Sequence, residues 1–137
     1  MRRYPIGIAA AAAIVAIAGC SSGGDDGPKS AQPTLTTPTS PAPGAVEVSP
    51  NGVTTAIGAP AESTETEYFQ ACRAAKEWMD QQGGDPKSQI EPYLATLQAP
   101  GAQPGPATFD TPWSQLSPAR QAAVIVAVQA GADALCG

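Results

Sequence analysis

The strongest constraint on this chain is a segment near its start that has almost nothing to bury. Residues 21–45 read SSGGDDGPKSAQPTLTTPTSPAPGA, in which Gly, Ser, Pro and Thr dominate and Leu35 is the one large apolar residue. Such a composition does not offset the entropy lost on ordering, so we expect a disordered tether. A flexible coil of about 25 residues spans roughly 25–30 Å. The fold is thereby limited to residues 46–137, which suffice for one small domain with a limited core.

The first 19 residues have the three parts of a secretory signal peptide. Arg2 and Arg3 give a basic start, residues 6–18 are an apolar run with one glycine, and small residues follow. A membrane-spanning helix needs about 20 apolar residues, so this shorter run predicts a segment that is removed. The residues IAGC at 17–20 resemble the bacterial lipobox, in which the chain is cut before the cysteine and that cysteine carries a diacylglyceryl group. We predict a signal peptide at 1–19 and lipidation of Cys20; the alternative is an ordinary secretory signal with a cysteine nearby.

The charge of the mature chain bears on its partners. Cutting before Cys20 removes Arg2 and Arg3, so the formal charge goes from −5 to −7. An acidic protein of this kind is not expected to bind nucleic acid or anionic lipid through its bulk charge. We expect contact with the membrane through the lipid on Cys20, and no nucleic-acid partner.

A turn signal predicts the first element of the domain. Residues 46–57, VEVSPNGVTTAI, alternate apolar and polar side chains on both sides of SPNG. Pro50 suits the second position of a turn, and Asn51-Gly52 supplies residues that tolerate positive φ. This pattern predicts a short β-hairpin or an extended segment. A lone hairpin is marginal in water, so it must lie on the helices.

A capping box predicts the first helix. Thr64 is followed three residues later by Glu67, and Gly83-Gly84 provide an end. Four residues recur at helical spacing and predict the buried face: Tyr68, Cys72, Ala75 and Met79.

Two further caps predict the remaining helices. Asp85-Pro86 opens a second helix, in which Pro92 forces a break or a restart. Ser117-Pro118 opens the last one, where residues 122–128 are apolar without a gap and predict a buried central helix. A strand is the competing interpretation there, because VIV is β-branched.

Two cysteines remain once Cys20 is lipidated. Cys72 and Cys136 most simply pair in an exported protein, so we predict an intramolecular disulfide. Closing a loop of about 65 residues stabilises by around 4 kcal/mol on the chain-entropy model. Since Cys72 lies early in its helix and Cys136 ends the last one, this bridge predicts that the two helices run roughly antiparallel. Two buried free thiols or an intermolecular bond are the alternatives.

The sequence contains no recognisable catalytic, metal or cofactor signature. It has no histidine, which excludes Ser-His-Asp and Cys-His sites and histidine metal ligands. The two later cysteines lack CxxC spacing, and no Gly-rich phosphate loop is present. Glu62, Glu65 and Glu67 cluster at a helix start, where capping explains them better than glycosidase chemistry. We expect no enzymatic activity, no catalytic residue, no metal and no cofactor.

Two side chains are candidates for contact with an unknown envelope protein. Trp78 falls partly off the buried stripe of its helix, and Arg73 lies on the same helix. The second interpretation is a carrier of a small apolar envelope molecule in a pocket between helices. Leu94 and Leu97 are core candidates of their helix, and a cavity lined by Leu94, Leu97, Val124 and Val128 would favour the carrier.

Several blocks in one order resemble the mycobacterial lipoprotein LpqV family. They are VSPNGVTT, APAEST, QAC before WMD, IEPYLA and SPARQAAVIVA with a final CG, and they extend over residues 46–137. The resemblance implies an actinobacterial cell envelope and a membrane lipid anchor, and it implies no known reaction or ligand. We therefore expect a mainly α, disulfide-stapled helical domain, lipid-anchored at the extracytoplasmic face of the cell membrane.

Overall fold

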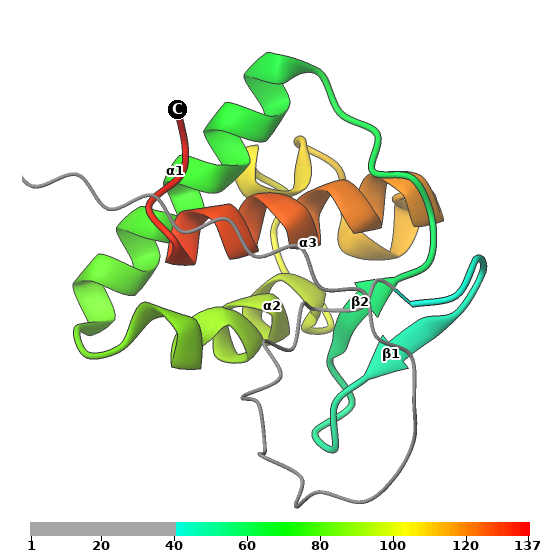
Figure 1. Cartoon of the computed structure of the whole chain (residues 1–137), viewed down its shortest axis with the longest axis horizontal. Helices are drawn as coiled ribbons and strands as arrows, with labels where there is room; N and C mark the ends of the chain where they lie inside the picture. Colours follow the sequence, from blue (N-terminus) through cyan, green and yellow to red (C-terminus); the bar gives the residue numbers. More distant parts are fainter. Residues whose placement is uncertain (1–40) are drawn as a thin grey trace, which may run out of the picture. The chain divides into compact units, whose positions relative to one another are not determined.

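The computed structural model describes residues 41–137; the predicted signal peptide, Cys20 and residues 21–40 of the predicted tether lie outside the described residues. The described part is mainly helical, with one antiparallel hairpin and a disulfide between Cys72 and Cys136 (Figure 1). This confirms the predicted fold class. Its elements are β1 (Val46–Val48), β2 (Thr54–Ile57), α1 (Glu65–Gln82), α2 (Ile90–Gln98), α3 (Pro118–Ala132) and 3₁₀ turns at Pro86–Gln89, Pro106–Thr108 and Trp113–Gln115.

Helix α1 begins and ends where its sequence signals predict. The Thr64 hydroxyl accepts from the Glu67 N–H, and the Glu67 carboxylate accepts from the Thr64 N–H at 2.9 Å, which completes the capping box. At the other end, Gly83 has a φ of 71° and its N–H donates to the Met79 carbonyl. The predicted stripe is buried at Cys72, Ala75 and Met79, and half-buried at Tyr68.

Helix α2 is a restart after a 3₁₀ turn, and this resolves the two outcomes predicted for Pro92. Asp85 caps the 3₁₀ turn by accepting from the Lys87 N–H, and Pro86 is its first residue. α2 begins at Ile90, so Pro92 occupies the first turn, where an N–H has no partner within the helix. Proline therefore sits in α2 without breaking it.

Helix α3 is buried on nearly all sides, as its unbroken apolar run predicts. The Ser117 hydroxyl accepts from the Arg120 N–H, and Pro118 is the first helical residue. Buried positions extend along the helix: Ala122, Ala123, Val124, Ile125, Ala127, Val128 and Gly131. Only a narrow strip at Val126 and Gln129 faces solvent in the middle of the helix. The strand interpretation is wrong here.

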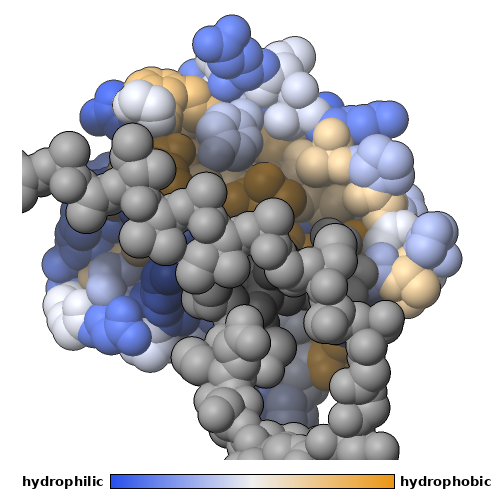
Figure 2. All heavy atoms as spheres, viewed as in Figure 1, coloured by the Kyte–Doolittle hydropathy of each residue, from blue (hydrophilic) through white to orange (hydrophobic). Residues whose placement is uncertain are grey.

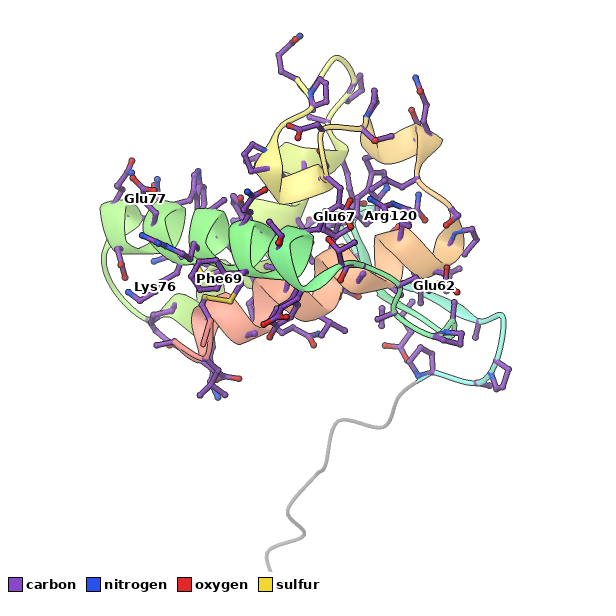
Figure 3. All side chains as sticks on the ribbon, turned by 90° about the horizontal axis from the view of Figure 1, so that it is seen from above. Glu62, Glu67, Phe69, Lys76, Glu77 and Arg120 are labelled. Atoms are coloured by element: carbon purple, nitrogen blue, oxygen red, sulfur yellow. A yellow bond between two sulfur atoms is a disulfide. The ribbon has the colours of Figure 1, made fainter. Side chains whose placement is uncertain are left out.

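Helices α1 and α3 cross while pointing the same way, so the predicted antiparallel arrangement is wrong. The Arg120 Nη2, near the start of α3, lies 2.6 Å from the Glu67 Oε1, near the start of α1 (Figures 1 and 3). Cys136 lies beyond the last residue of α3, Ala132, and bonds to Cys72. A bridge between these two points fixes one contact and not a direction.

The crossing depends on a residue that the sequence interpretation passed over. Gly131 lies against the backbone of α1, where an added Cβ would lie 2.8 Å from the Cys72 carbonyl oxygen and 3.1 Å from the Ala75 Cβ. Only a residue without a side chain permits this approach. The small residues of α1 and Gly131 together let the two helices pack closely.

The hairpin is held on α2 by side chains, as a marginal hairpin requires. The Thr54 N–H donates to the Gln98 Oε1 at 2.8 Å, and the Gln98 Nε2 donates to the Thr54 carbonyl at 2.9 Å. Gln98 thereby continues the β-ladder and closes that edge of β2. The Asn51 Nδ2 also donates to the Glu91 carboxylate at 2.9 Å, which fastens the turn to the start of α2.

Candidate functional site

The residues that would line the pocket of a carrier form the core, which confirms Leu94 and Leu97 as core candidates. Leu94, Val124 and Val128 are fully buried, and Leu97 is partly buried against them. They pack with Met79 and the other core side chains. Neither cavity described below is lined by any of the four.

Trp78 and Arg73 lie on different sides of α1. Their five-residue separation places them about 140° apart around the helix axis. Trp78 is half-buried and packs on Tyr93 with ring centroids 5.1 Å apart, and burial raises the pKa of Tyr93 to about 12. Arg73 is exposed, and its guanidinium lies 5.5 Å from the centre of the Phe69 ring. The two residues therefore do not form one contact surface, and Trp78 mainly contributes to packing.

The larger cavity is a groove beside the exposed strip of α3, here called the α3 groove. Its volume is about 760 Å³. The lining comes from the chain before β1, the hairpin, the segment after it and α3: Pro41, Pro43, Glu47, Thr55, Ala56, Ile57, Gly58, Ala59, Pro60, Ala61, Ala122, Ile125, Val126 and Gln129. Val126 is 45% exposed in the middle of a helix that is otherwise buried. On the face drawn in Figure 2, apolar side chains gather over α3.

A second cavity of about 520 Å³ lies beside the start of α1, here called the Phe69 pocket. Its lining combines α1 with the chain after α3: Glu65, Thr66, Tyr68, Phe69, Leu135, Cys136 and Gly137. Phe69 is 40% exposed and Leu135 is 68% exposed. The sequence signal for Phe69 was its position one residue beyond the buried stripe, whereas nothing in the local pattern distinguished Val126 or Leu135.

The chain is ordered at Leu135 by a strained turn. The Leu135 N–H donates to the Ala130 carbonyl at 2.8 Å, and the Ala134 N–H donates to the Gly131 carbonyl at 3.1 Å. These are the two bonds of a Schellman motif, whose left-handed position usually holds glycine. Here that position is Ala134, with a φ of 56°. The motif keeps Leu135 in an exposed position next to Phe69.

An ion pair joins the starts of α1 and α3. The Arg120 Nη2 donates to Glu67 at 2.6 Å, and its guanidinium also lies 4.6 Å from the centre of the Phe109 ring. The hydrogen bond from Arg120, followed by that from the Thr64 backbone, lowers the pKa of Glu67 to about 2. Within the acidic cluster noted in the sequence, the Glu67 carboxylate thus accepts hydrogen bonds from the helix cap and from Arg120, while Glu62 and Glu65 are exposed.

The described residues have an excess of acidic side chains. Residues 41–137 hold ten acidic and four basic residues. Three of the four cations form salt bridges, which are Lys76–Asp80 at 2.6 Å, Lys87–Asp133 at 2.9 Å and Arg120–Glu67 at 2.6 Å. Among salt bridges between residues 41–137, none involves Arg73 or Glu65.

The described part of the chain offers neither a metal site nor a membrane-spanning helix. Between residues 41 and 137, no group of three or more His, Cys, Asp or Glu side chains is arranged to hold a metal ion. No helix in this same range combines the length and the apolar character that crossing a membrane requires.

Comparison with known proteins identifies the family. Residues 40–137 match the family described as "Putative lipoprotein LpqV". Proteins of that name from Mycobacterium bovis and from two strains of Mycobacterium tuberculosis are 53% identical to this chain over 131 residues, which are 95% of this chain and 91% of theirs. No solved structure matches. Since the match extends over the whole described fold and most of both sequences, the chain belongs to the LpqV family of lipoproteins.

Proposed function

We propose that this protein is a non-enzymatic interaction module, held at the extracytoplasmic face of the cell membrane by lipid on Cys20. The lipid anchor is supported by the lipobox-like IAGC at 17–20 and by the lipoprotein family. One acyl chain holds a protein at a membrane only marginally, and two or more hold it stably. Residues 21–40, rich in Gly, Ser, Pro and Thr, lie between Cys20 and the domain in the sequence.

The observation that carries the interaction role is the α3 groove. Helix α3 is buried or half-buried at most positions, yet it presents Val126 to solvent in the same groove as Ile125 and the chain that follows β2. The groove is concave and mostly apolar in its lining, which is the usual form of a binding site. An apolar segment of an envelope protein would bury Val126 together with Ile57, and Gln129 at the rim would supply a polar contact.

A carrier role is the second candidate, and it rests on the size of the same groove. About 760 Å³ lies within the roughly 300–1,000 Å³ range of small-molecule sites. The groove is also mostly apolar, with Glu47 and Gln129 among its few polar side chains. A small apolar envelope molecule would therefore compete with a protein segment for the same surface.

Photo-crosslinking in the native membrane distinguishes the two roles. A photoreactive phenylalanine analogue at position 126 lies in the groove, and the same analogue at position 114, on an exposed turn away from the groove lining, is the control. An adduct with another protein that forms at 126 and not at 114 supports the interaction role. An adduct with the mass of a lipid supports the carrier, and equal labelling at both positions contradicts both roles.

The anchor has its own test. Cys20→Ala should move the protein from the membrane fraction to the medium, or leave it unprocessed, because the thiol that carries the lipid is gone. Subcellular fractionation with mass measurement reads the result. Processed Cys20→Ala protein that still sediments with the membrane would contradict lipidation at this residue.

A further inference from the structure

We propose that the flank of α1 centred on Phe69 is a self-association surface, on which two copies of this chain pack antiparallel about a two-fold axis. The inference deepens the interaction role proposed above by naming a second copy as one partner. It uses the Phe69 pocket and not the α3 groove, so the two proposals stand on different surfaces.

The spacing of three exposed residues on α1 defines this flank. Glu65 and Arg73 lie four residues before and after Phe69, so each is displaced by about 6 Å along the axis and about 40° around it, in opposite senses. The three therefore form one stripe with Phe69 at its centre. In Figure 3, Phe69 lies on the side of α1 next to the C-terminal segment, with Glu62 toward one end and Lys76 toward the other.

The charges along the stripe are self-complementary. A two-fold axis at Phe69 sets each residue before it opposite the residue equally far after it in the second copy. Glu65 of each copy then faces Arg73 of the other, which forms two contacts, each between a negative and a positive side chain. Neither residue belongs to a salt bridge within residues 41–137. Lys76, one turn further along α1, is paired with Asp80 at 2.6 Å, so the pairing between copies rests on Glu65 and Arg73.

The centre of the surface is apolar and already ordered. Phe69 and Leu135 are 40% and 68% exposed and line the same 520 Å³ pocket. The Schellman motif at Ala134 and the bond between Cys136 and Cys72 both hold Leu135 in place. A backbone that is fixed before binding loses little freedom when its side chain is buried. A second copy can therefore place its Phe69 or Leu135 beside the pocket at low entropic cost.

The order of the charges favours a second copy over other occupants. A lipid or a foreign protein places no requirement on where acid and base lie relative to Phe69. A copy of the same helix does, because antiparallel packing turns an acid-to-base order into two matched pairs. The arrangement thus suits an isologous contact, in which one surface meets itself.

The test is photo-crosslinking of the full-length, membrane-anchored protein with a photoreactive phenylalanine analogue at position 69. Two populations with different epitope tags are co-expressed, so that an adduct between copies carries both tags. The wild-type charges should give a product of twice the chain mass that carries both tags. The same analogue at position 48, which is exposed on β1, is the control and should give no such product.

Charge exchange tests the antiparallel register. E65R alone and R73E alone should each reduce the adduct about tenfold, because two attractive contacts become repulsive. The double variant E65R/R73E should restore it, since the pairs are only exchanged. E65R co-expressed with R73E should also form the mixed adduct, although neither variant pairs with itself.

Several results would overturn the proposal. They are an adduct at position 69 with a different protein or a lipid, no adduct above the position 48 control, or single variants that crosslink as well as wild type. A groove adduct at position 126 in the same membranes would leave the interaction role standing after such a failure. Circular dichroism of each variant checks that the fold is retained.

Discussion

Loss of the Cys72–Cys136 disulfide should lower the free energy of unfolding by about 4 kcal/mol. The bridge closes a loop with a sequence separation of 64, and the chain-entropy model assigns about 4 kcal/mol to a loop of that size. A domain of about 100 residues has a total stability of roughly 5–15 kcal/mol. The bridge is therefore a large share of what keeps this small fold together.

The perturbation is the double variant C72A/C136A in a chain that starts at Ser21, so that Cys20 does not add a third thiol. Alanine suits position 72 because that residue is fully buried and a serine would bury a hydroxyl. Urea unfolding followed by circular dichroism gives both the free energy and its slope. In thermal unfolding followed by the same signal, we expect the midpoint temperature to fall by about 15–30 °C. The slope of the free energy of unfolding against urea concentration should rise, because the unfolded chain is no longer cross-linked.

The single variants C72A and C136A are the matched controls. One bridge is one interaction, so each single variant should lose nearly as much stability as the double variant. A loss below about 1 kcal/mol in the double variant would refute the reasoning. So would single losses that add up to the double, because this would mean that each cysteine contributes through its own packing and not through the cross-link.

Three further predictions follow from individual contacts. Ala134→Gly should raise the free energy of unfolding by about 0.5–1 kcal/mol in urea, because glycine adopts the left-handed position without the cost to a Cβ; an unchanged or lower value would contradict the strain. Gln98→Ala should lower the free energy of unfolding by about 1–3 kcal/mol and increase hydrogen exchange in the hairpin, because the Thr54 N–H and C=O lose their partners. Hairpin exchange equal to that of the wild type would contradict this role of Gln98. The lowered pKa of Glu67 adds about 1 kcal/mol of stability above pH 4.5, a modest amount because the pair with Arg120 is partly exposed, and this stability is lost as the pH falls toward 2. Glu67→Gln keeps the capping box and should remove this part of the pH dependence of unfolding. A pH profile identical to that of the wild type would refute the assignment.

The sequence predicted well those features that depend on residues close together in the chain. Thr64 and Glu67 are three residues apart, and the capping box they form needs only a helix between them. Ser117 and Pro118 likewise mark the start of α3, and its apolar run predicted a buried helix. The disulfide followed from counting, because Cys72 and Cys136 were the two cysteines left once Cys20 was assigned to lipid.

Tertiary structure alone decided how these pieces meet. The shared direction of α1 and α3 depends on Gly131 lying on the α1 backbone and on Arg120 reaching Glu67, contacts between residues more than 50 positions apart. No local pattern reports such a pairing. For the same reason no local pattern indicated that Val126 and Leu135 would be exposed in the packed fold. Helix boundaries follow from hydrogen bonds within a few residues, but the exposed surface depends on which faces the whole chain covers.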